Sequence, residues 1–158
     1  METDSSLDSL DRRILQALQA SGRATYDELA AGIGLSASAT LRRVKRLEES
    51  GVITGYVALV APERVGLGLT AYINVRLAKH SEQRSPTDDF AAAVQAWPEV
   101  VECAALTGDM DYLLRVLVRD MSHCSRFIMD SLLRHPSVQD CKTSFMMRRL
   151  KGTTAVPL

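Results

Sequence analysis

Four positively charged side chains fall within five consecutive positions of one predicted helix. They are Arg42, Arg43, Lys45 and Arg46, in a segment over residues 36–49 whose apolar residues recur at helical spacing. Guanidinium and ammonium groups at this density bind phosphate oxygens or the edges of nucleic-acid bases. Because the chain has a formal net charge of 0 at pH 7, the basic patch indicates a focused contact with an anion, not a general affinity for polyanions.

The helical period separates two faces of this segment. Thr40, Val44 and Leu47 share the face that would pack on other helices, with Ser36 and Arg43 at its edges. The outward face begins with small side chains and continues into cations; it carries Ser38, Ala39, Leu41, Arg42, Lys45, Arg46 and Glu49. Small side chains allow the start of a helix to enter a major groove about 12 Å wide, where Arg and Lys reach bases or phosphates. The alternative is a basic helix face that is merely solvated.

Two further helices precede this segment. The first is expected to begin after Asp8 as its N-cap, and the second after Thr25, which forms a capping box with Glu28. The second helix is predicted to stop at Gly32, where a tight turn begins, and Ser36 caps the third helix. Three short helices with a glycine turn before the third predict a helix-turn-helix.

Beyond an extended stretch over 52–60 and a linker at Pro62, the apolar period changes to two, which is typical of half-buried strands. Strands are predicted over 69–77, 100–106, 112–118 and 138–147, and helices over 85–97 and 121–133. The order βαββαβ is that of a ferredoxin-like domain, with two helices on one face of a four-stranded antiparallel sheet. The predicted fold class is therefore α+β, with a helix-turn-helix domain over 1–60 and a ferredoxin-like domain over 61–158.

Segments in both halves follow the pattern of one family, in matching order. They are Leu10–Leu15, Leu35–Thr40, Arg43–Glu48, Gly51–Tyr56, Pro98–Val100, Cys103, Thr107–Leu114 and Lys151–Leu158. This set resembles the Lrp/AsnC family of bacterial and archaeal transcription regulators over nearly the whole chain. The resemblance implies a winged-helix-like domain that binds double-stranded DNA, and a ferredoxin-like domain that senses a small molecule, usually an amino acid. It also implies homodimers that associate further, often into octamers. The residues expected to contact DNA are Ser36, Ser38, Arg42, Arg43, Lys45 and Arg46.

The resemblance further implies that the effector lies between dimers, beside the turn that joins the second and third strands. Here that turn consists of Thr107, Gly108, Asp109, Met110 and Asp111, and Thr143 on the last strand matches a family position near the same pocket. Gly108 permits close approach of the backbone to a ligand, and Asp109 or Asp111 can bind an ammonium group. Met110 stands where the family often has an aromatic residue, which favours an apolar or sulfur-containing amino acid. Without the resemblance, an ordinary hairpin turn is the simpler interpretation.

No catalytic or metal-binding group is expected. His80, His123 and His135 are scattered along the sequence, and the three cysteines form no CxxC pair. They are expected to be reduced thiols in a cytoplasmic protein. No cofactor other than the small effector is expected, and the protein is not expected to be an enzyme.

Two other functions fit the same architecture. One is an enzyme resembling the siroheme decarboxylases, and the other is an amino-acid-binding regulatory subunit. The exposed row of Ser38, Arg42, Lys45 and Arg46 has no use in a decarboxylase and favours DNA binding.

The apolar content and its distribution predict no membrane partner. The hydrophobic fraction is 46%, with no apolar run approaching the roughly 20 residues that span a bilayer. The acidic start Met1–Asp4 is not followed by an apolar run, so no secretory signal is expected.

Overall fold

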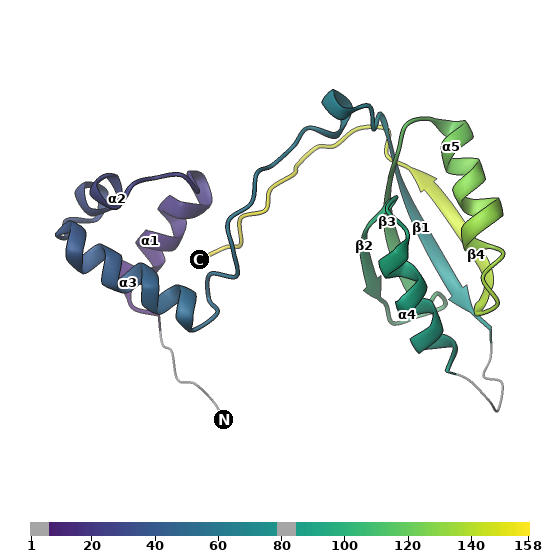
Figure 1. Ribbon diagram of the computed structural model, residues 1–158, viewed down its shortest axis with the longest axis horizontal. Coiled ribbons are helices and arrows are strands. Elements are labelled where there is room, and N and C mark those ends of the chain that lie inside the picture. Colours follow the sequence, from purple (N-terminus) through teal and green to yellow (C-terminus); the bar gives the residue numbers. More distant parts are fainter. Residues whose placement is uncertain (1–6, 79–84) are drawn as a thin grey trace. The chain divides into compact units, whose positions relative to one another are not determined.

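The computed structural model describes residues 7–78 and 85–158 (Figure 1). His80 and the acidic segment Met1–Asp4 lie outside these residues. The chain divides into two compact units: residues 7–59 with 151–158, and residues 60–78 with 85–150.

The N-terminal unit contains three short helices that begin where the sequence predicts. They are α1 (Ser9–Ala20), α2 (Tyr26–Ile33) and α3 (Ala37–Glu49). Asp8, Thr25 and Ser36 are the N-caps, and each side-chain oxygen accepts a hydrogen bond from a backbone N–H in the first turn. Thr25 and Glu28 form the predicted capping box, and Asp8 forms a second one with Asp11.

The end of α2 differs from the prediction by one residue. The helix includes Ile33, which is 6% exposed and belongs to the core. Gly34, with φ of 82°, is the C-cap, because the left-handed conformation that closes the helix falls there and not on Gly32. The Arg13 guanidinium completes this end by donating to the carbonyl oxygens of Ile33 at 3.1 Å and Gly32 at 2.9 Å.

The last eight residues return to the N-terminal unit, although the sequence-based boundary assigned them to the second domain. The Gln19 side chain bonds to both backbone polar groups of Val156, and Leu158 packs against the core of the helices. Residues 151–158 form no helix or strand. Without a repeating apolar pattern, the sequence carried no signal of where this segment packs.

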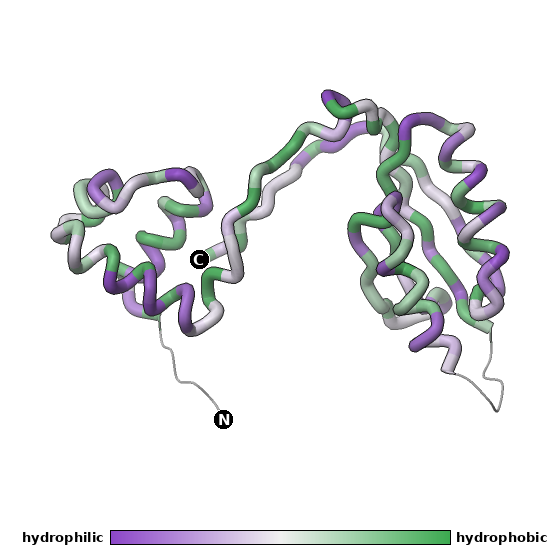
Figure 2. Tube along the Cα trace, viewed as in Figure 1, coloured by the Kyte–Doolittle hydropathy of each residue, from purple (hydrophilic) through white to green (hydrophobic). Residues whose placement is uncertain are grey.

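Residues 56–60, which follow α3 after a short turn, are mostly apolar and exposed. Figure 2 shows their hydrophobic character, and Val57 and Leu59 are 82% and 74% exposed. These residues belong to no strand within the chain.

The C-terminal unit has the predicted ferredoxin-like order. The unit begins with a short 3₁₀ turn, η1 (Pro62–Val65). Its strands are β1 (Leu69–Leu77), β2 (Val100–Ala105), β3 (Tyr112–Val118) and β4 (Val138–Phe145). Its α-helices are α4 (Pro86–Ala96) and α5 (Met121–Arg126). The four strands are antiparallel in the order β2-β3-β1-β4.

The predicted helix over 121–133 changes character half-way. It is α-helical to Arg126 and continues as the π-helical segment η2 (Phe127–Leu132). The wider π turn brings Phe127 and Leu132, five positions apart, toward the same side, and both are buried.

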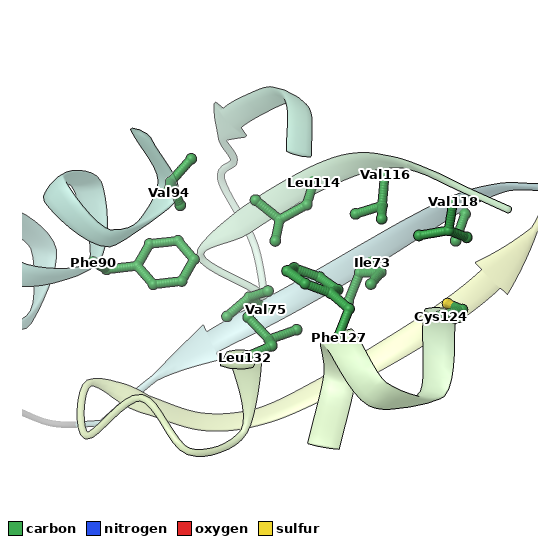
Figure 3. Close-up of a cluster of buried hydrophobic side chains, with 11 residues drawn as sticks. Ile73, Val75, Phe90, Val94, Leu114, Val116, Val118, Cys124, Phe127 and Leu132 are labelled. Carbon is green, nitrogen blue, oxygen red and sulfur yellow. The ribbon is translucent and has the colours of Figure 1, made fainter. Parts of the chain in front are cut away.

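Both helices cover one face of the sheet. Figure 3 shows Phe90 of α4 and Phe127 of η2 directed at the same core as Ile73 and Leu114 of the strands. Among residues 60–78 and 85–150, no helix or strand covers the opposite face, which is called the open face below. It carries the alternate residues of the central strands, paired as Thr70 with Leu117, Tyr72 with Arg115 and Asn74 with Leu113.

Candidate DNA-binding helix and effector turn

The helix α3 presents the two faces that its sequence predicts. Thr40, Val44 and Leu47 are at most 1% exposed and pack within the N-terminal unit. Ser38, Arg42, Lys45 and Arg46 are exposed on the remaining surface of the helix. Ser36 is also exposed, and its hydroxyl accepts the N–H of Ala39 at 3.2 Å as the N-cap.

Two of the four cations are bound by Asp11 of α1 and by Asp8, the N-cap of that helix. The Arg43 Nη1 atom donates to Asp8 Oδ2 at 2.7 Å and to Asp11 Oδ1 at 2.8 Å, and Arg46 Nη2 donates to Asp11 Oδ2 at 2.5 Å. The Asp11 side chain is only 1% exposed. Asp11 is not among the residues that the sequence predicts for this site, because its only local signal is its place in the first turn after Asp8.

These contacts change the electrostatics of the helix face. The hydrogen bonds that Arg43 donates to Asp8 and Asp11 raise the pKa of Arg43. The hydrogen bond that Asp8 accepts from the backbone N–H of Asp11, and then the one it accepts from Arg43, lower the pKa of Asp8. Two acids therefore balance two arginines. Within residues 7–78 and 85–158, Arg42 and Lys45 form no ion pair.

The turn between β2 and β3 contains one residue with special backbone geometry. Gly108 has φ of 118°, and a Cβ placed there would meet no atom within 4 Å. Thr107 and Asp109 are exposed, and the sulfur of Met110 lies 3.7 Å from Arg76 Nη2. This part of the turn is open to a ligand.

Asp111 is already engaged within the sheet. Its N–H donates to the Val75 carbonyl at 2.9 Å, and its carboxylate accepts the N–H of Leu77 at 2.7 Å. The hairpin-turn interpretation therefore accounts for Asp111. The geometry leaves Asp109 as the freer acid of the turn.

A cleft of about 380 Å³ lies beside this turn. Its lining is formed by Leu77, Ala78, Pro86, Thr87, Ala105, Leu106, Asp111 and Tyr112. Thr143 does not line it. This residue lies on β4, where it pairs with Ile73 of β1, and β1 separates β4 from β3. Within one chain, the sheet order therefore does not bring Thr143 to the turn.

A larger open groove, of about 710 Å³, lies on the N-terminal unit between α1 and α2. Its charged lining residues are Arg13, which closes the end of α2, and Glu28, which belongs to the capping box. Both side chains already serve the fold, so we assign no site to this groove.

The described histidines and Cys124 contact other side chains of the fold. His135 packs edge-on against Phe90 and Trp97, with ring centroids 6.1 and 6.0 Å away, and His123 contacts Glu99 at 3.1 Å. Cys124 is buried, and burial raises the pKa of its thiol. Among the described residues, no three His, Cys, Asp or Glu side chains form a metal-binding group, and no helix is long and apolar enough to cross a membrane.

Family comparisons identify both units. Residues 7–54 match a family described as winged helix-turn-helix DNA-binding, and residues 70–156 match the Lrp/AsnC ligand binding domain. The chain belongs to the Lrp/AsnC family. This confirms the resemblance and both domain types, and it identifies the protein as a DNA-binding transcription regulator.

The similarity to individual relatives extends over nearly the whole length of this chain. The leucine-responsive regulatory protein of Haemophilus influenzae is 38% identical over 153 residues, covering 97% of this chain and 91% of the relative. A transcriptional regulator from Neisseria meningitidis, solved in complex with L-methionine, has a TM-score of 0.92 and 47% identity, covering 96% and 97% of the two chains. A feast or famine regulatory protein from Mycobacterium tuberculosis, also complexed with L-methionine, has a TM-score of 0.84 and 30% identity, covering 96% and 99%.

Proposed function

We propose that this regulator binds paired half-sites in double-stranded DNA through the exposed face of α3. The supporting observation is the contrast between the buried side of this helix and its outward Arg42 and Lys45, which have no acidic partner among the described residues. Ser38 lies near the capped start of the helix, where a small side chain allows close approach to the groove. Arg46 contributes the part of its guanidinium that Asp11 does not hold.

Arg43 has a different role in this proposal. Its guanidinium is bonded to two carboxylates and its side chain is 25% exposed, so it ties α3 to α1. Ser36 similarly serves as the cap of the helix. Neither residue is required as a primary DNA contact.

We further propose an amino acid as the effector, bound beside the turn over 107–111 and completed by another copy of the chain. The open backbone at Gly108 and the exposed Asp109, which forms no ion pair with any described residue, suit the carboxylate and ammonium groups of an amino acid. The apolar Met110 suits an apolar or sulfur-containing side chain. Two structural relatives hold L-methionine, which makes methionine the first compound to test.

Assembly would use the open face of the sheet. Its apolar Leu113 and Leu117 alternate with Arg115, and a second sheet packed on this face would remove them from water. The binding of an effector at a junction between copies would change the spacing of the α3 helices, and thereby the affinity for DNA. The names of the relatives favour this regulator over a siroheme-decarboxylase-like enzyme or a regulatory subunit.

Two measurements test the proposal. Selection from a random-sequence duplex library should enrich a motif with two related half-sites, and the absence of any enriched motif would refute sequence-specific binding. Thermal-shift screening against the twenty amino acids should raise the unfolding temperature with methionine or a similar side chain. An equal change of the unfolding temperature with all twenty amino acids would refute the proposal of a specific amino-acid effector.

A further inference from the structure

Asp11 connects α1 to two arginines of the DNA-facing helix. Its carboxylate accepts from Arg43 through Oδ1 and from Arg46 through Oδ2, and Oδ2 also accepts the backbone N–H of Asp8 at 3.2 Å. A carboxylate that is 1% exposed needs such partners, because an unpaired buried charge is strongly destabilising. Both oxygens of Asp11 thus determine where the two guanidinium groups lie.

The two arginines differ in how many of their N–H donors are bonded to carboxylates. Arg43 donates to two carboxylates and is 25% exposed. Arg46 is 59% exposed, and among the described residues its guanidinium donates only to Asp11, through Nη2. A guanidinium group has five N–H donors, so Arg46 keeps most of them for another partner. Because one edge of the group is already fixed, it loses less conformational freedom when it binds a phosphate.

The same contacts limit the long-range attraction of the helix for DNA. Asp8 and Asp11 balance the charges of Arg43 and Arg46 at short range. The unbalanced charge on this face then comes from Arg42 and Lys45. Attraction to DNA of any sequence depends on such unbalanced cations, whereas correct register depends on contacts held in a defined direction.

We propose that Asp11 is a positioning residue for DNA recognition: it holds Arg46 with its free edge toward the duplex and prevents the Arg43–Arg46 pair from adding sequence-independent attraction. This rests on the proposed DNA contact through α3. Asp11 itself touches no DNA in this arrangement. It acts on the ratio between the affinities for a selected site and for random sequence.

A purely structural role for Asp11 would produce a different result. Either role predicts that Asp11→Asn lowers the unfolding temperature, because a buried pair is weakened. Only the positioning role predicts a loss of discrimination that requires Arg46. A double-mutant cycle between the two positions separates these roles.

The experiment compares two duplexes bound by the full-length protein. One is the sequence that the wild type enriches from a random library, and the other is a scrambled duplex of the same composition. Asp11→Asn is expected to lower the affinity ratio about tenfold, within the usual coupling between contacting residues. Affinity for the scrambled duplex should stay equal or rise, with a steeper salt dependence, because one negative charge is removed.

Variants of Arg46 complete the cycle. Arg46→Gln should lower the ratio by a similar factor, and Asp11→Asn should change it by less than about twofold when Arg46 is already Gln. Arg46→Lys should lower the ratio while affinity for the scrambled duplex is retained, because the charge remains but the planar fork is lost. Asp8→Asn is the matched control: it removes an acceptor of Arg43, leaves the Asp11–Arg46 pair, and should keep the ratio near that of the wild type.

Several outcomes would overturn the inference. A folded Asp11→Asn protein whose affinity ratio equals that of the wild type would overturn it. It would also be overturned if the double variant Asp11→Asn, Arg46→Gln lowered the ratio by the product of the two single effects, because the two positions would then act independently. If Asp11→Asn does not fold, an unchanged ratio in Arg46→Gln and Arg46→Lys overturns it. If the wild type enriches no sequence, the proposed function fails, and this inference with it.

Discussion

Gln19 and Val156 are separated by 137 positions in the sequence but bond to each other twice. The Gln19 side-chain Nε2 donates to the Val156 carbonyl at 3.1 Å, and the Val156 N–H donates to Gln19 Oε1 at 2.5 Å. The side-chain amide thus occupies both backbone groups of one residue, as a neighbouring strand would. With Leu158 against the core of the helices, this fixes the last residues of the chain on the N-terminal unit.

Gln19→Ala should therefore destabilise the N-terminal unit. Two exposed hydrogen bonds are lost, for which we expect a decrease of about 1 kcal/mol in the free energy of unfolding. Urea unfolding followed by circular dichroism measures the change. Gln16→Ala, an exposed glutamine on the same helix, is the control, and equal stabilities of the two variants would contradict a role for the tail contact.

Arg42 and Lys45 should affect DNA binding in different ways. Arg42→Ala should cost about 1–3 kcal/mol on the selected duplex if its guanidinium reads a base edge, with a smaller loss on scrambled DNA. Lys45→Ala should weaken both duplexes similarly and reduce the salt slope by about one per contacting chain. Fluorescence titration over a range of salt concentrations measures both effects. Arg12→Ala, an exposed arginine on α1, is the control. Wild-type binding by both α3 variants would show that the outward face of α3 does not contact DNA.

Gly108→Arg should abolish the response to the effector and retain DNA binding. The added side chain would project into open space and fill the approach to the backbone, while α3 is unchanged. DNA titrations with and without methionine measure the response. Gly108→Ala is the control, because it introduces the same backbone strain at φ of 118° without the bulk. A normal response in Gly108→Arg would place the effector elsewhere.

Leu113→Glu should weaken assembly of the chain. Leu113 pairs with Asn74 on the open face, and two such faces cannot pack closely over buried, unpaired carboxylates. Sedimentation velocity should show a shift toward smaller species. Met129→Glu places a carboxylate at a position that is 59% exposed in η2 and should leave the assembly unchanged. Identical sedimentation of the two variants would exclude the open face as an interface.

Acid should destabilise the N-terminal unit through Asp8. Its folded-state pKa is lowered, so its stabilising effect is present above its ordinary value of 3.8 and is lost as the pH falls through the folded value. The unfolding temperature should drop below about pH 4, and Asp8→Asn should flatten this drop. Asp109→Asn, at an exposed turn position, is the control. An equally steep acid response in Asp8→Asn would mean that other groups cause it.

Contacts within one turn of a helix could be predicted from the sequence. Asp8, Thr25 and Ser36 cap their helices because each oxygen needs only a backbone N–H up to three positions ahead, a distance set by helix geometry. The sheet followed from alternation and chain order, since βαββαβ with short connections admits few arrangements. The basic outward face of α3 followed from the same helical periodicity.

Only the tertiary structure decided which cations of that face are free. Arg43 and Arg46 occupy a basic run in the sequence, but their acidic partner lies 32 and 35 positions away on α1. Likewise, only the tertiary structure shows that Val156 bonds to Gln19. It also shows that the order of the strands separates Thr143 from the turn at Gly108. Periodicity determines which side of an element is buried, whereas a bond between distant residues depends on how whole elements pack and in which register.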